Sequence, residues 1–276
     1  MKTALITGAS TGIGYDLAHC FAREGFDLVV VARNQEKLAR LAGELNQKYG
    51  ISVTVLAKDL SFPVAPAEIF IDLREKEISV DVLVNNAGFG SHGAFAETDL
   101  ATEMEMMQVN MVSLVELTKL FMREMLKRGE GKILNVASTA AFAPGGPLMS
   151  IYYATKAFVL SFSEALSEEL RGTGVTVTCL CPGATKTEFQ ERAGIQRIWL
   201  LRGGMLDSKA VAEAGVRGLM KGKRLVVPSL RSKLQVLLIK FSPRRLVTLV
   251  VKWVQMKIGE PGIKTEKTSR SGGGSS

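Results

Sequence analysis

The 276-residue sequence predicts an α/β fold with one doubly wound, mainly parallel sheet and helices on both faces. Short runs of β-branched and apolar residues recur, and they lack the alternation of a sheet that has one face in water. Segments of helical period separate these runs, and no stretch rich in Pro, Gly or Ser interrupts them before residue 228. We therefore expect a single domain over residues 1–228.

Seven segments have the composition of buried strands. They are TALIT from residue 3, FDLVVVA from 26, SVTVLA from 52, DVLVNN from 81, KILNVAS from 132, VTVTCLC from 175 and RLVVP from 224. The helices that we expect between them include residues 13–24, 35–49, 100–127, 152–171 and 208–221. The helix over 100–127 is apolar on two sides. One side should pack on the sheet, and the other should be either internal or in contact with a second subunit.

Charge is unevenly distributed along the chain. The net charge is +8, yet residues 1–228 contain 25 basic and 25 acidic side chains, and the excess lies in the remainder. A neutral body without interleaved basic and aromatic residues argues against a nucleic-acid partner. Three cysteines and two histidines show no metal-ligand spacing, which predicts no metal and a reducing, cytoplasmic location. No apolar run approaches the ~20 residues that span a bilayer.

A glycine-rich turn follows the first strand directly, and a helix follows the turn. Gly8 suits the tight turn, Gly12 lets the backbone approach a pyrophosphate, and Gly14 lets the helix pack closely on the strand. The amides at the start of the helix would face the phosphates. This context predicts a dinucleotide site in a Rossmann-like domain.

Polar residues at later strand ends extend this site. Arg33 stands where an NAD enzyme usually has an acidic residue, and its guanidinium suits a 2′-phosphate, so NADP(H) is expected, with NAD(H) as the alternative. Arg33 could instead be a solvated surface charge. Asp59 is a candidate for the adenine amine, and residues 86–88 for the adenosine ribose.

Tyr152 and Lys156 are one helical turn apart, after a strand that ends in Ser138. An ammonium near the phenol would lower the pKa of the tyrosine toward neutrality, as a proton donor to a carbonyl requires. Tyr153 is the rival, but residue 157 is alanine, so it has no lysine one turn further on.

These motifs together resemble the short-chain dehydrogenase/reductase family in its single-domain form, over residues 2 to about 228. The resemblance implies catalytic roles for Asn110, Ser138, Tyr152 and Lys156. Tyr152 would be the acid/base, Ser138 would bind the substrate oxygen, Lys156 would hold the nicotinamide ribose, and Asn110 would anchor a water relay. The residues expected at the cofactor are Gly8, Ser10, Thr11, Gly12, Ile13, Gly14, Arg33, Asp59, Leu60, Asn86, Ala87, Gly88, Tyr152, Lys156, Pro182, Gly183, Thr185 and Thr187.

The function expected from this set is interconversion of a ketone and a secondary alcohol. The alternative is a catalytically silent NADP(H) sensor or scaffold of the same fold. Residues 189–206 mix apolar and charged side chains and are expected to form a lid over a small-molecule substrate. Apolar residues there and near the serine favour a lipophilic substrate; those near the serine are Phe95, Phe142, Pro144, Pro147 and Leu148.

The remainder of the chain divides into two parts. Residues 229–258 contain no acidic residue and read as a cationic amphipathic helix. Leu246, Leu249, Val250, Trp253 and Val254 form its expected apolar face, and Arg244, Arg245, Lys252 and Gln255 the polar one. This extension resembles that of the broad-specificity and 17β-hydroxysteroid branch of the family. It could pack on the domain, on a partner subunit of a homodimer or homotetramer, or peripherally on a membrane. Residues 259–276 are expected to be disordered.

Overall fold

The computed structural model describes residues 1–189, 193 and 205–258. One parallel sheet has the order β3-β2-β1-β4-β5-β6-β7. Its strands are β1 (Thr3–Thr7), β2 (Asp27–Ala32), β3 (Val53–Ala57), β4 (Val82–Asn85), β5 (Gly131–Val136), β6 (Val175–Leu180) and β7 (Leu225–Val226). The strand order reverses between β1 and β4, so their carboxyl ends border the crevice where such sheets bind ligands. The predicted doubly wound fold is confirmed.

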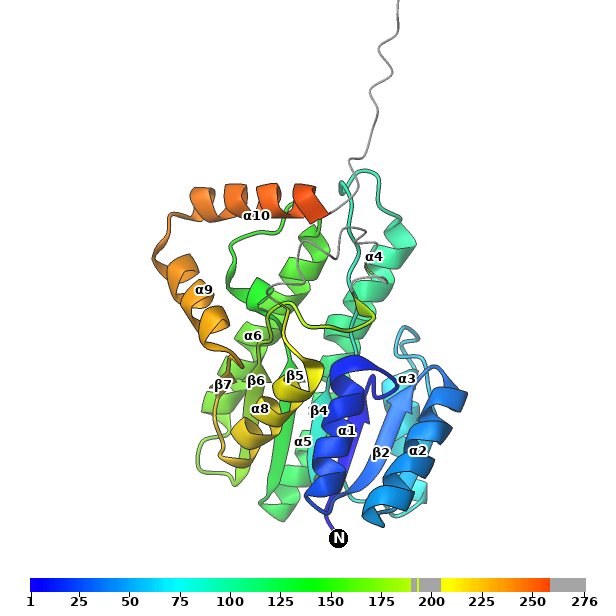
Figure 1. Ribbon diagram of the computed structural model, residues 1–276. Helices are drawn as coiled ribbons and strands as arrows, with labels where there is room; N and C mark the ends of the chain where they lie inside the picture. The colour runs from blue at the N-terminus through cyan, green and yellow to red at the C-terminus, as the bar shows by residue number, and fades with distance from the viewer. Residues whose placement is uncertain (190–192, 194–204, 259–276) are drawn as a thin grey trace, which may run out of the picture.

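Helices cover both faces of the sheet (Figure 1). One face carries α1 (Gly12–Arg23), α2 (Gln35–Tyr49) and α8 (Ser208–Met220); the other carries α3 (Ala65–Glu75), α5 (Ser113–Arg128) and α6 (Ser150–Glu169). On α1, Leu17 and Phe21 are one turn apart and fully buried against the sheet. The helix α3, which has a proline in its first turn, is not among the helices expected from the sequence.

The helix expected over 100–127 is interrupted. It consists of α4 (Leu100–Met107), a π-helical turn η1 (Gln108–Val112) and α5. The π-turn adds a residue to the helical repeat, which rotates everything before it relative to α5. For this reason Met106 is fully buried, whereas Met104 is 56% exposed.

The expected amphipathic helix over 229–258 is two helices, α9 (Leu230–Phe241) and α10 (Arg244–Ile258). Pro243 lies between them, and proline readily separates two helices because it cannot donate a backbone hydrogen bond. Both helices fold back over the end of the sheet where α4 lies (Figure 1). Residues 259–276 are outside the described part of the chain.

The side of α10 that faces the domain combines residues from both of the faces that the sequence predicted. Val247, Gln255 and Ile258 are buried, and they form one stripe along the helix. Most of the expected apolar face is about half exposed or more in the single chain: Leu246 52%, Leu249 64%, Val250 52% and Trp253 57%. The expected polar face therefore supplies a buried glutamine. Apolar residues occupy most of the circumference of α10, so hydrophobic pattern alone could not define its inward side.

Candidate active site

The glycine turn is closed by contacts that leave no room for side chains. Gly8 has φ +66°, and a Cβ there would lie 2.9 Å from Cα of Ala87. Gly12 has φ +59°, and its Cβ would lie 2.8 Å from Cγ2 of Thr187. A Cβ on Gly14 would clash with the carbonyl oxygen of Gly8. The backbone amides at the start of α1 are thus accessible to a phosphate without side chains in the way.

Asn86 ties β4 to this turn. Its Nδ2 donates to the carbonyl oxygens of Thr7, at 2.9 Å, and Gly8, at 3.2 Å. The hydroxyl of Thr7 accepts hydrogen bonds from the backbone amides of Asn86 and Ala87, both at 3.0 Å. The asparagine therefore has a structural role in holding the predicted cofactor site, and Asn86 also lines the cavity that contains this site.

Asn110 lies in the π-helical turn and is 1% exposed. Its amide exchanges two hydrogen bonds with the backbone of Phe89, at 3.0 and 3.1 Å, and donates a third to Oγ1 of Thr155 at 3.1 Å. A Cβ on Gly88 would lie 2.9 Å from Oδ1 of Asn110 and 3.3 Å from Nζ of Lys156. Asn110 and Lys156 therefore approach the same glycine, as the predicted relay between them requires.

Tyr152 and Ser138 come together from α6 and the end of β5. The Ser138 side chain lies close enough to the phenol to lower its pKa, and the serine hydroxyl donates to the carbonyl oxygen of Pro182 at 3.4 Å. Ser138 has an extended backbone and caps a short 3-10 helix, η2 (Thr139–Phe142), by accepting from the amide of Ala140 at 3.1 Å. The Phe189 ring lies 5.2 Å from the Tyr152 ring, so an aromatic wall stands beside the phenol.

The electrostatics of the tyrosine and lysine differ from the sequence expectation. Burial raises the pKa of Tyr152 above its ordinary value, and the hydrogen bond with Ser138 offsets only part of this rise. Burial also lowers the pKa of Lys156 to about 8. Its Nζ donates to the carbonyl oxygen of Val136 at 3.0 Å. In the chain alone the phenol is therefore held neutral, and the predicted lowering of its pKa by the lysine is not observed.

Arg33 and Asp59 meet at the rim of the cavity, beyond β2 and β3. Nη1 of Arg33 lies 3.9 Å from Oδ2 of Asp59, and the arginine side chain is 64% exposed. At this exposure the ion pair contributes little to stability. The guanidinium is thus held near the adenosine end of the predicted site while most of its donors still face solvent.

One cavity of about 1520 Å³ joins these groups. Every predicted catalytic and cofactor residue lines it except Asn110 and Gly14, which lie behind its wall. The apolar part of the wall is different from the expectation. Phe95, Phe142, Pro144, Pro147 and Leu148 do not line the cavity, and Phe95 is 61% exposed. Apart from Phe189, Ala193, Met205 and Leu206, the expected lid lies outside the described residues.

Sequence reasoning missed the wall that α9 and α10 contribute. Its side chains include Leu234, Leu238, Val247, Val251, Val254, Gln255 and Ile258, joined by Met149 and Tyr153. The only available signal was that the chain continues past its last strand, because the contact itself is tertiary.

Among the described residues, no three His, Cys or acidic side chains gather as a metal site requires. No described helix has both the length and the apolar character of a membrane span.

Comparisons with known proteins agree with this architecture. The family model described as short chain dehydrogenase matches residues 2–197. The ketoacyl reductase HetN of Nostoc sp. is 32% identical over 226 residues, which cover 79% of this chain and 75% of that protein.

Two solved structures extend the likeness. A short-chain dehydrogenase from Sphingobium yanoikuyae, solved with NADPH, has a TM-score of 0.78 at 36% identity and covers 86% of this chain and 92% of its own. The bulky-bulky ketone specific alcohol dehydrogenase from Comamonas testosteroni has a TM-score of 0.73 at 29% identity, covering 98% and 99%. The chain therefore belongs to the short chain dehydrogenase family, and it is an oxidoreductase that acts on CH–OH donors.

Proposed function

We propose that this enzyme interconverts a ketone and a secondary alcohol with NADP(H). The observation that supports this most is a single cavity in which Ser138, Tyr152 and Lys156 lie beside the glycine turn. Bound NADP(H) would supply the hydride to the carbonyl carbon, or accept it in the reverse direction. A protonated phenol is needed to donate a proton to the oxygen, and burial favours that form of Tyr152.

The other polar residues have separate roles in this proposal. The hydroxyls of Ser138 and Tyr152 hydrogen-bond the substrate oxygen and stabilise the negative charge that develops on it. Lys156 holds the ribose hydroxyls at the nicotinamide end. Asn110 anchors a water relay to Lys156, and its bonds to Phe89 also fix the loop that follows β4.

NADPH oxidation with ketones of graded size tests the proposal, with NADH run in parallel. We expect turnover of at least one class of ketone, and its loss in Tyr152→Phe. If folded enzyme oxidises NADPH with none of a broad carbonyl panel, the proposal of ketone reduction with NADP(H) is wrong, and the silent sensor is favoured.

A preference for NADP(H) over NAD(H) is supported by Arg33. The side chain lines the cavity at its rim and is largely exposed, so its guanidinium can reach an added phosphate on the adenosine ribose. Asp59, which lies 3.9 Å away, would orient the guanidinium. A 2′-phosphate would then meet a cation instead of the acidic residue that selects NAD(H).

A lipophilic substrate is supported by the apolar wall of the cavity that contains the catalytic side chains. Met149, Phe189, Val254 and Ile258 face the cavity together with apolar residues of α9. Contact with such a wall removes apolar substrate surface from water and so makes the free energy of binding more favourable. A few polar groups then fix the orientation of the bound substrate. The ketone panel above tests this: the ratio kcat/KM should rise with the size of the apolar substituent.

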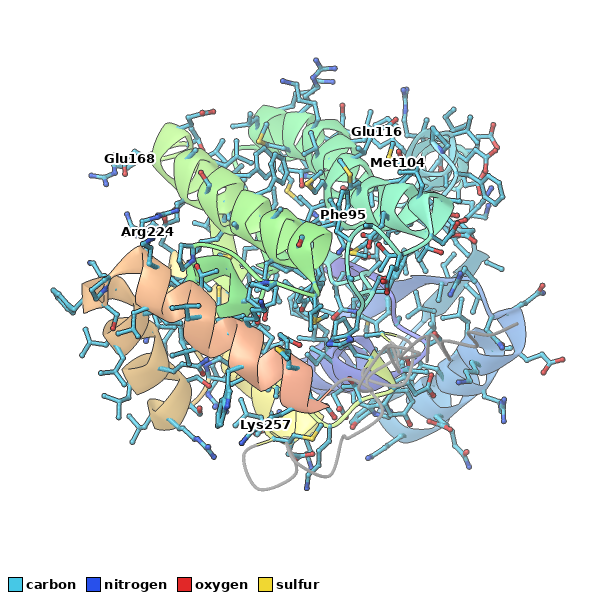
Figure 2. The ribbon with its side chains drawn as sticks, turned by 90° about the horizontal axis from the view of Figure 1, so that it is seen from above. Phe95, Met104, Glu116, Glu168, Arg224 and Lys257 are labelled. Carbon is cyan, nitrogen blue, oxygen red and sulfur yellow. The ribbon has the colours of Figure 1, made fainter. Side chains whose placement is uncertain are left out.

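We also propose that α4 and α5 mediate a homodimer, or one interface of a homotetramer. Leu100 (70% exposed) and Met104 (56%) on α4 and Val112 (47%) in η1, directly before α5, expose apolar side chains. Figure 2 shows Met104 and Phe95 in the same part of the molecule. Light scattering should give a multiple of the monomer mass, and Met104→Glu should lower it. A monomeric wild type would contradict this part of the proposal.

A separate surface is proposed to contact a membrane. The outer sides of α9 and α10 expose large apolar side chains, among them Leu230 (83%), Phe241 (78%), Leu249 (64%) and Trp253 (57%). Residues 229–258 also contain seven Lys and Arg and no acidic residue. A two-fold contact between copies would place these cations against one another, so an anionic lipid surface at the cytoplasmic side fits better.

Vesicle sedimentation tests this contact. The enzyme should sediment with vesicles of phosphatidylcholine and phosphatidylglycerol, and less at high salt. The double variant Leu249→Gln with Trp253→Gln should lose the binding, whereas Phe62→Gln, which changes a 62% exposed side chain elsewhere, should keep it. Failure to bind, or self-association that the double variant abolishes, would contradict the proposal.

A further inference from the structure

Gln255 is turned into the molecule, whereas Trp253 and Met256 on the same helix face out. It is 6% exposed, whereas Trp253 and Met256 are 57% and 58% exposed. Its backbone carbonyl accepts a hydrogen bond from Nε2 of His92 at 3.2 Å, which fixes this turn of α10 to the loop after β4. A helix that exposes tryptophan and buries glutamine loses hydrophobic stabilisation, so the buried amide calls for a physical reason.

The amide has one partner and one unused atom. Nε2 of Gln255 donates to Oη of Tyr153 at 3.1 Å. Oε1 is buried and has no hydrogen-bond partner among the residues that the structure describes. Leaving a buried amide oxygen without a donor is unfavourable, and in enzymes such atoms often await a ligand.

Tyr153 is equally incompletely paired. In the described part of the chain its hydroxyl accepts from Gln255, and no acceptor is found for its own proton. The ring is held between Gly146, which leaves no room for a Cβ, and the Tyr152 ring, whose centre is 6.1 Å away. Burial raises the pKa of Tyr153, so the hydroxyl keeps its proton.

Tyr153 and Gln255 both line the cavity that contains the catalytic residues. We propose that Oη of Tyr153 and Oε1 of Gln255 form a second polar subsite, which recognises a hydroxyl group on the substrate away from the reacting carbonyl. This inference rests on the proposed ketone reduction and adds to it a feature of the substrate.

The chemistry of the pair selects a hydroxyl. Tyr153 offers a proton and Gln255 offers a lone pair, and a hydroxyl both accepts and donates. A second carbonyl would satisfy Tyr153 only and leave Oε1 unpaired. A carboxylate would bring a negative oxygen against Oε1, and a methyl group would satisfy neither atom. Sites built for a hydroxyl discriminate strongly against analogues that lack it, because their own polar groups then stay buried and unpaired.

Matched cyclohexanones test the subsite, with a hydroxyl, a carbonyl, a methyl or a carboxylate at ring position 3 or 4 and NADPH as the reductant. We expect kcat/KM for one hydroxyketone to exceed that for its methyl analogue by at least about 10-fold, mostly through KM. In Gln255→Met and in Tyr153→Phe, the ratio of hydroxyl to methyl substrate should fall toward one. Gln47→Leu, an exposed glutamine on α2, should leave the ratio as in wild type.

The outcomes separate the two proposals. If wild type turns over the methyl ketones but shows no preference for a hydroxyl at either position, the subsite is wrong and ketone reduction stands. A hydroxyl preference that persists in both variants also overturns the subsite, as does a stronger preference for the carbonyl. If no ketone in any series is reduced, the underlying reaction itself is wrong, and the subsite proposal fails with it.

Discussion

Nζ of Lys156 lies 5.9 Å from the centre of the Tyr152 ring and donates its hydrogen bond to Val136 instead of to the phenol. Both side chains titrate abnormally for the same reason, because burial disfavours the charged form of each. In the unliganded site the Tyr152 phenol is therefore a neutral proton donor. The Lys156 amine beside it loses its charge at mildly alkaline pH, around its pKa of about 8.

Replacing the phenol tests its role as the acid. Tyr152→Phe removes the hydroxyl and keeps the ring that packs against Phe189. We expect kcat to fall by about 10²–10⁴-fold, the usual contribution of a positioned general acid, with little change in cofactor affinity. Steady-state NADPH oxidation and equilibrium binding of NADPH measure the two quantities. Tyr49→Phe, on α2, is the control. Wild-type kcat in Tyr152→Phe would contradict the assignment.

Lys156 should make stability depend on pH. Its pKa is about 8 in the folded chain and 10.5 ordinarily, so between these values the unfolded state binds more protons. The free energy of unfolding of the cofactor-free enzyme should therefore rise from pH 8 toward pH 10.5, and the stabilisation should be lost as pH falls through this window.

The variant Lys156→Met isolates this effect. It removes the buried charge, so at pH 7 it should be more stable than wild type by roughly 1–3 kcal/mol while reducing no ketone. Denaturant titrations at a series of pH values measure the difference. A variant that is less stable than wild type at pH 7, or that keeps the alkaline rise, would show that the lysine charge is not the cause.

The strands and the glycine turn could be predicted because both are local. Their signals are runs of consecutive apolar residues and glycines at fixed spacing, and the tight contacts of Gly8 and Gly14 agree with the reasons given for them. The positions of Ser138, Tyr152 and Lys156 could be predicted for the same reason. Each lies at or near a strand end or a helix start, so the parallel sheet brings them to one edge.

The remaining features depend on contacts that no local pattern contains. One inserted residue at the π-turn changes the side of α4 that is buried, so Met106 is in the core and Met104 is exposed. On α10 the inward side combines buried Val247 and Ile258 with hydrogen bonds from Gln255 and to its carbonyl. The apolar wall of the cavity was misplaced for the same reason, because α9 and α10 reach the cavity only through the tertiary fold.

A methyl group on the third glycine should disrupt the cofactor site. In Gly14→Ala the new Cβ meets the carbonyl oxygen of Gly8, which is backbone and cannot rotate away. We expect a loss of about 1–3 kcal/mol in unfolding free energy and weaker NADPH binding. Gly43→Ala is the matched control: it lies in α2, has open space at Cβ and should stabilise by about 0.5–1 kcal/mol. Equal effects at both sites would refute the close-packing argument.

The choice of cofactor should depend on Arg33. In Arg33→Ser the guanidinium at the rim is lost, and with it the charge-assisted hydrogen bonds proposed for the 2′-phosphate. Since such bonds contribute about 1.5–3 kcal/mol, kcat/KM for NADPH should fall about 10–100-fold, whereas the value for NADH should change little. Arg40→Ser removes an exposed arginine from α2 that does not line the cavity, and it should leave both values as in wild type.

Because the phosphate is the only difference between the two cofactors, a parallel fall for NADPH and NADH would mean that Arg33 acts on the fold of the rim and not on the phosphate. A wild type that works better with NADH would remove the basis for the NADP(H) preference altogether.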